Sequence, residues 1–152
     1  MEDYTKHEAL ARENFKKGYN CAQSIMLAYT DVTGLDEDTA LRMASPFGGG
    51  MGRMREVCGA ISGIYMVLGL LEGYSTPGDD IAKKELYSKV QSLAESYRQE
   101  NGSIICRELL GLTTIGPDDP TPSKRTDEYY KLRPCEVKIG NAARILDLYL
   151  NM

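Results

Sequence analysis

The apolar run from Ala60 to Leu71 constrains the fold of this chain more than any other stretch of its sequence. One serine and two glycines interrupt the run, and it falls short of the ~20 residues that a membrane-spanning helix needs. The wider segment, from about Arg55 to Leu71, is apolar on nearly every side of a helix, which is typical of a helix buried at a protein's centre. We therefore expect a soluble protein built around a central helix that starts near Cys58.

Helical spacing also dominates the rest of the chain, and no run of alternating residues favours a strand. Residues that start helices, such as Asn20 and Asp36, and residues that stop them, such as Gly18, mark several boundaries. A length of 152 residues gives one domain with a real core. The fold class is therefore an all-α, single-domain irregular bundle of about five to seven helices over residues 1–152. The expected helices span residues 4–17, 21–30, 37–44, 55–71, 81–99, 103–111 and 135–150, with a surface loop at about 112–132 that ends in a helical turn from 127.

A glycine-rich stretch followed by two arginines, Phe47–Arg55, leads into the central helix. A Walker loop would need Lys-Ser or Lys-Thr after its last glycine, and a dinucleotide-binding loop would need a further glycine and a preceding strand. The stretch meets neither requirement, so we expect a tight loop packed against neighbouring helices. Arg53 and Arg55 would oppose the helix dipole unless an anion is near, which could be Glu56, a thiolate or a ligand. A solvated pair that bridges to acidic neighbours is an equally good interpretation.

Four cysteines, Cys21, Cys58, Cys106 and Cys135, are spread over four segments with no Cys-x-x-Cys pair. Each is predicted in the first turn of a helix, where the partial positive charge favours a thiolate. Converging helix ends would bring these thiols together. Cys58, at the start of the central helix, is the predicted reactive thiolate.

Three residues after Cys58 are candidates for a supporting role. Gly59 and Gly63 lie one turn apart on the same helix face, which lets another helix or a ligand approach the backbone closely. Ser62 lies four residues after Cys58, so its hydroxyl could hydrogen-bond a sulfur, although such serines more often bond to the carbonyl of the preceding turn.

Composition excludes several classes of function. The net charge is −4 and acidic residues are mixed in throughout, so we expect no nucleic-acid partner. His7 is the only histidine, which argues against a histidine-rich metal centre, and we expect it half-exposed at a helix edge. The polar start of the chain, Met1–Lys6, lacks the pattern of a signal peptide, and we expect a cytoplasmic protein.

The four cysteine segments together resemble a family of redox-active proteins described by four separated cysteines and a Cys-Gly-Ala-x-x-Gly core. The core stands here as Cys58–Gly63, and the family label C_GCAxxG_C_C differs from it by placing glycine before cysteine. The resemblance covers nearly the whole chain. It implies a redox role for the cysteines and a functional link to a transporter, because members are encoded near transporter genes. The other matching segments are Tyr19-Asn20-Cys21-Ala22-Gln23, Cys106-Arg107-Glu108-Leu109-Leu110-Gly111 and Pro134-Cys135.

The leading hypothesis is a thiol-based redox protein of the thiol–disulfide oxidoreductase kind, with a redox partner or small thiol as co-substrate and no cofactor. Cys58 attacks, Arg53, Arg55 and the helix dipole lower its pKa, and one of the other three cysteines resolves the intermediate.

Two alternatives remain open at this stage. The first is a metal-binding protein in which the four cysteines hold zinc or an iron–sulfur cluster, although their wide spacing disfavours it. The second is a non-catalytic helical protein that binds a partner and uses its cysteines only for packing.

Overall fold

A computed structural model describes residues 3–113 and 115–152, and it has the expected all-α, single-domain fold. Met1 and Glu2 of the polar start, and Thr114 of the expected loop, lie outside the described residues. Within the described ranges, the only β-pairing is an isolated bridge between Val57 and Ile105. The elements are α1 (Lys6–Lys16), α2 (Cys21–Ala28), α3 (Thr30–Thr33), α4 (Glu37–Ala44), the 3-10 helix η1 (Ser45–Phe47), α5 (Gly48–Met51), α6 (Gly59–Glu72), α7 (Asp80–Asn101), α8 (Cys106–Leu109), α9 (Asp127–Leu132) and α10 (Cys135–Leu150).

The helices outnumber the five to seven expected because the chain adds short ones, such as α3 and α5, while the helix expected over 103–111 is shortened to α8. A single turn carries no periodic apolar pattern, so it leaves little trace in a sequence. The helix starts that depend on capping residues are confirmed. Asn20 and Gln23 form a capping box at α2, and the Asp36 side chain accepts from Thr39 N at α4.

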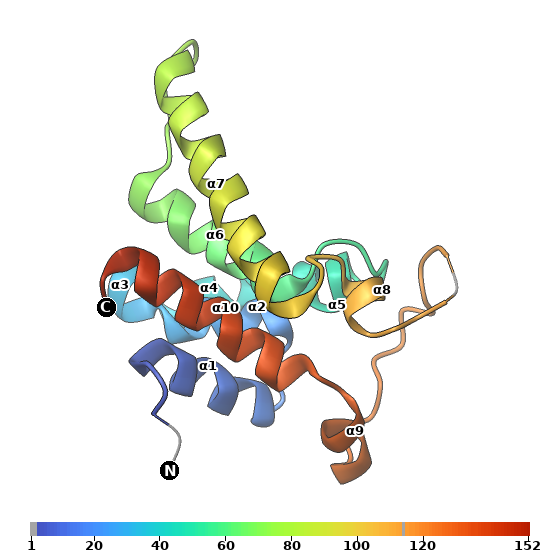
Figure 1. Ribbon diagram of the computed structural model, residues 1–152. Coiled ribbons are helices and arrows are strands. Elements are labelled where there is room, and N and C mark those ends of the chain that lie inside the picture. Colours follow the sequence, from blue (N-terminus) through green and yellow to red (C-terminus); the bar gives the residue numbers. More distant parts are fainter. Residues whose placement is uncertain (1–2, 114) are drawn as a thin grey trace.

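The core lies where α2 and α6 pack together, with α1 and α10 against them (Figure 1). The first half of α6 is buried, as predicted for the central helix, with Ala60, Ile61 and Ile64 fully enclosed. Its last turn differs from the prediction because Leu70 and Leu71 are exposed. Figure 1 shows the reason: α6 and α7 form a hairpin whose far end extends beyond the other helices.

His7 is fully buried rather than half-exposed. Its Nδ1 lies 2.7 Å from Asp147 Oδ1 on α10, and its Nε2 lies 3.0 Å from Asp31 Oδ1 on α3. The ring also stacks on Tyr29, with 4.1 Å between ring centroids. This network joins α1 to α10, the helix that carries Cys135 at its other end.

The loop after α8 is hydrogen-bonded to the stretch Phe47–Arg55, called the glycine–arginine segment below. Asp118 N donates to Arg53 O at 2.9 Å, and Arg53 Nε donates to Asp119 O at 2.7 Å. The expected helical turn is present as α9, which the side chain of Thr126 caps. No helix among residues 3–113 and 115–152 combines the length and apolar composition that crossing a bilayer requires.

Candidate thiol site

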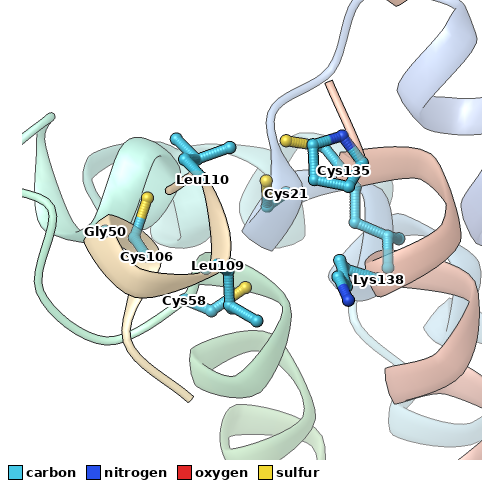
Figure 2. A pocket seen from close by; sticks show the side chains of 11 residues that line it. Cys21, Gly50, Cys58, Cys106, Leu109, Leu110, Cys135 and Lys138 are labelled. Carbon is cyan, nitrogen blue, oxygen red and sulfur yellow. The ribbon is translucent and has the colours of Figure 1, made fainter. Parts of the chain in front are cut away.

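All four cysteines stand at helix starts, as predicted. Cys21, Cys106 and Cys135 are the first residues of α2, α8 and α10, and Cys58 is the N-cap of α6. The four also line one small apolar cavity of about 20 Å³, room for about one water molecule. Figure 2 shows their side chains gathered around it. The fold therefore brings together cysteines from four distant segments, and all four are free thiols.

Cys21 and Cys135 are a facing pair within this group. Their side chains face each other from the starts of α2 and α10 (Figure 2). The pKa of Cys135 is lowered to about 7, first by the neighbouring Cys21 thiol and then by the charges of Arg133, Arg125 and Arg55, which outweigh its burial. The pKa of Cys21 rises, because the neighbouring Cys135 thiol and burial both disfavour its charged form. These opposite shifts favour the thiolate form of Cys135 over that of Cys21.

The pKa of Cys58 shifts in the opposite direction to that of Cys135. The backbone amides of Ala60 and Ile61 at the helix start act to lower the pKa of Cys58, as does the Tyr97 hydroxyl, which lies 3.7 Å from its sulfur. Burial outweighs these contacts and raises the pKa of Cys58 to about 11. The structure therefore disfavours Cys58 as the thiolate at neutral pH.

Arg55 faces Cys106 rather than Cys58. Its Nη1 lies 3.6 Å from Cys106 Sγ, and its Nε donates to Asp118 Oδ2 at 2.8 Å. The pKa of Cys106 is still raised, because burial exceeds the effect of the guanidinium. Arg53 bonds to the loop through Asp119 and Ser123. The two arginines therefore contact Cys106 and the loop, and not Cys58 as expected.

A left-handed backbone places these arginines. Every residue from Gly49 to Arg53 has φ between 59° and 69°, and Arg55 has φ 61°. Such angles are costly for residues with side chains, and they are found where the surrounding structure enforces them. Gly50 has no alternative, since a Cβ there would lie 2.6 Å from Cys106 Cβ. The glycines expected to form a tight loop thus bring the arginine segment against α8.

Gly59 and Gly63 of α6 have the role expected for them. A Cβ on Gly59 would lie 3.0 Å from Cys21 Cβ and 2.9 Å from Phe47 O, and one on Gly63 would meet Ile25 at 2.7 Å. Both allow α2 to approach α6, and Gly59 allows Cys21 to lie directly against the start of α6. Ser62 contributes its amide to Cys58 O at 3.1 Å.

Sequence reasoning missed two arginines of the site, Arg125 and Arg133. Arg125 donates to Phe15 O and Tyr19 O and lies over the Phe15 ring, while Arg133 lies over the Tyr129 ring. Arg133 stands two residues before Cys135, a proximity visible in the sequence, whereas only the path of the loop places Arg125 there.

Among the described residues no ligand group for the metal alternative is assembled, and metal binding by the four cysteines stays a prediction. In the part of the chain that the structure describes, no three His, Cys, Asp or Glu side chains form a group that could hold a metal ion. Although the four thiols line one cavity, they divide between the Cys21–Cys135 pair and separate partners of Cys58 and Cys106.

Comparison with known proteins gives one match. The family model described as "Putative redox-active protein (C_GCAxxG_C_C)" matches residues 19–149, a range that contains all four cysteines. No curated protein and no solved structure matches the chain.

Proposed function

This chain belongs to the C_GCAxxG_C_C family of redox-active proteins, and we propose that it performs thiol–disulfide exchange through Cys135 and Cys21. The observation that carries the proposal is the facing pair itself, whose two thiols border a pocket lined by four arginines. A thiol whose pKa lies near ambient pH is the most effective attacking group in such exchange. Of the four cysteines, Cys135 alone has its pKa lowered toward that range.

The reaction proceeds in two displacements. The Cys135 thiolate attacks one sulfur of a substrate disulfide, forms a mixed disulfide and releases the other half as a thiolate. Cys21 then loses its proton to solvent or to the released thiolate, attacks Cys135 Sγ and expels the second half. The substrate disulfide gains two electrons, and the two protein thiols become the Cys21–Cys135 disulfide. A small-molecule thiol in excess restores the dithiol by the same two displacements in reverse.

This assignment replaces Cys58 with Cys135 as the attacking residue. Cys58 borders the same cavity, but its sulfur is enclosed and bonded to Tyr97. Its position suits it to keeping the site packed, or to a slower exchange after the first disulfide has formed. Cys106 lies on the other side of the cavity, held by Arg55.

Equilibration in glutathione redox buffers, followed by alkylation of the free thiols and peptide mass spectrometry, tests the pairing. We expect a single intramolecular disulfide between Cys21 and Cys135, also in a Cys106→Ser variant. A disulfide that instead joins Cys58 to another cysteine would overturn the assignment. A protein that stays fully reduced in oxidised glutathione would overturn the function.

A further inference from the structure

A second, larger pocket opens beside the thiol pair. Its volume is about 370 Å³, within the range of small-molecule sites. It lies between the glycine–arginine segment, the loop before α9, and the starts of α2 and α10. Three thiols border it, those of Cys21, Cys106 and Cys135, and two of these are the proposed reactive pair. A molecule in this pocket therefore lies against the cysteines of the proposed reactive pair.

The pocket is strongly cationic. Four arginines line it, Arg53, Arg55, Arg125 and Arg133, and its lining contains neither aspartate nor glutamate. The carboxylate nearest these arginines is Asp118, which lies 2.8 Å from Arg55 Nε and 3.9 Å from Arg53. One carboxylate against four guanidinium groups leaves net positive charge around the cavity. A chain with an overall charge of −4 thus concentrates cations at its thiols.

Arg133 is the arginine best placed to hold a ligand. The guanidinium of Arg125 is fixed by two backbone carbonyls, and those of Arg53 and Arg55 are bonded to the loop. Arg133 lies over the Tyr129 ring, 5.3 Å from its centroid, and makes no ion pair within the described residues. Its donors remain available at the entrance to Cys135.

We propose that this pocket selects low-molecular-weight disulfides that carry carboxylates, with Arg133 binding a carboxylate while the disulfide faces Cys135. The inference rests on the proposed exchange at Cys135 and names the substrate class for it. Guanidinium groups suit carboxylates because their planar donors match the two oxygens. The chemistry is that of the two displacements above: one small disulfide is reduced to two carboxylate-bearing thiols while Cys21 and Cys135 are oxidised.

Three disulfides of equal chain length and different charge test the selection. They are 3,3′-dithiodipropionate, which is an anion, bis(2-hydroxyethyl) disulfide, which is neutral, and cystamine, which is a cation. Each is mixed with reduced protein at pH 7 and low salt, and the rate of Cys135 oxidation is measured. We expect the anion to react fastest and the cation slowest. The ratio of anion rate to neutral rate is the readout, because the thiolate fraction cancels from it.

The variant Arg133→Gln tests the proposed contact between Arg133 and a substrate carboxylate. Loss of a hydrogen bond to a charged group should lower the anion-to-neutral ratio about tenfold. Arg98→Gln serves as the matched control, because Arg98 is an exposed arginine of α7 paired with Glu95. The control should leave the ratio unchanged. Suberate, which matches the dithiodipropionate in length but has no disulfide, should slow the anionic substrate competitively and should lose this effect in Arg133→Gln.

The outcomes separate this inference from the function on which it rests. If the neutral disulfide also fails to oxidise Cys135, the exchange reaction itself is overturned. If the neutral disulfide reacts but the anion shows no advantage, or if Arg133→Gln and Arg98→Gln give the same ratio, the carboxylate site is overturned while the exchange stands.

Discussion

The two ends of α10 differ in how they hold a negative charge, that of the buried Asp147 at one end and the one proposed for Cys135 at the other. At the C-terminal end, the Asp147 carboxylate accepts from His7 Nδ1 at 2.7 Å and from the Tyr29 hydroxyl at 2.7 Å. At the N-terminal end, Cys135 lies beside Cys21 and borders an open pocket that is lined by guanidinium groups. The first charge is fully bonded and holds helices together. The second, as proposed, is stabilised but accessible, which is the condition for a nucleophile.

A substitution at the buried end of α10 should have the largest effect, which is on the free energy of unfolding. Asp147→Asn removes the charge between His7 and Tyr29 and replaces one of its two acceptor oxygens by an NH2 group, which cannot accept from the buried donors. Because breaking one side of a buried ion pair is costly, the variant should lose about 3–5 kcal/mol of unfolding free energy.

Urea denaturation measures this loss, and Asp31→Asn is the control. Asp31 bonds the other nitrogen of His7, but its side chain is 41% exposed, so its replacement should cost below about 1 kcal/mol. Equal losses in the two variants would show that the buried end of α10 has no special role.

The next effect is on reactivity. At pH 7 a thiol with the pKa of Cys58, about 11, has an ionised fraction of roughly 10⁻⁴. A thiol with the pKa of Cys135, about 7, is roughly half ionised. The lower intrinsic nucleophilicity of the more acidic thiol offsets part of this, leaving Cys135 an advantage of roughly 10²-fold. Cys135→Ser should therefore abolish reduction of bis(2-hydroxyethyl) disulfide, and Cys58→Ser should retain it. Retention in the first variant and loss in the second would reverse the assignment.

A smaller effect links packing to the thiol pair. Gly59→Ala inserts a methyl group against Phe47 O and the start of α2, and overpacking of this kind costs about 1–3 kcal/mol. Gly69→Ala is the matched control, because nothing lies within 4 Å of its added Cβ, and it should gain about 0.5–1 kcal/mol from helix propensity. Thermal unfolding should show a lower midpoint than that of the native chain for Gly59→Ala and a higher one for Gly69→Ala. A neutral Gly59→Ala would show that α2 and α6 are not held at this distance.

The smallest effect is on the pH dependence of stability. Burial disfavours the charged form of His7, but its hydrogen bonds to Asp147 and Asp31 outweigh this and raise its pKa above 6.5. A raised pKa stabilises the folded state fully below the unfolded value and loses that contribution as pH rises through the folded value. The contribution of His7 to the unfolding free energy should therefore decline above about pH 6.5, the ordinary histidine pKa, in the native chain.

The same decline should be absent from Asp147→Asn, in which the main partner of His7 no longer carries a charge. Denaturation curves at a series of pH values would show this. A difference in unfolding free energy between the native chain and Asp147→Asn that grows through the same interval would contradict a protonated His7.

The sequence was sufficient to predict the longer helices and the placement of the cysteines at helix starts. Asn20 before Cys21 and Pro134 before Cys135 are local signals, and local signals determine where helices start. The choice of reactive thiol depends on how deeply each cysteine is buried, which no local pattern predicts. Cys58 has the helix start predicted for it and still has a raised pKa, because it is buried in the core.

The cationic pocket could be predicted only in part. Arg53 and Arg55 stood out in the sequence, but their targets depended on the left-handed backbone between Gly49 and Arg53 and on the path of the loop. Arg125 approaches Cys135 across ten residues of chain and one short helix, and no local pattern predicts such a contact. The buried state of His7 was missed for the same reason, since its partners lie 24 and 140 residues away.

The central claim is that Cys135 carries the thiolate of this fold. It is tested most directly by measuring the iodoacetamide alkylation rate of each cysteine in the reduced native protein across a pH series, resolved by peptide mass spectrometry. The account predicts that Cys135 is modified first, with a midpoint near pH 7, and that Cys58 is modified last. If Cys58 reacts first, or if no cysteine has a midpoint below the roughly 8.5 of a free thiol, the claim is contradicted.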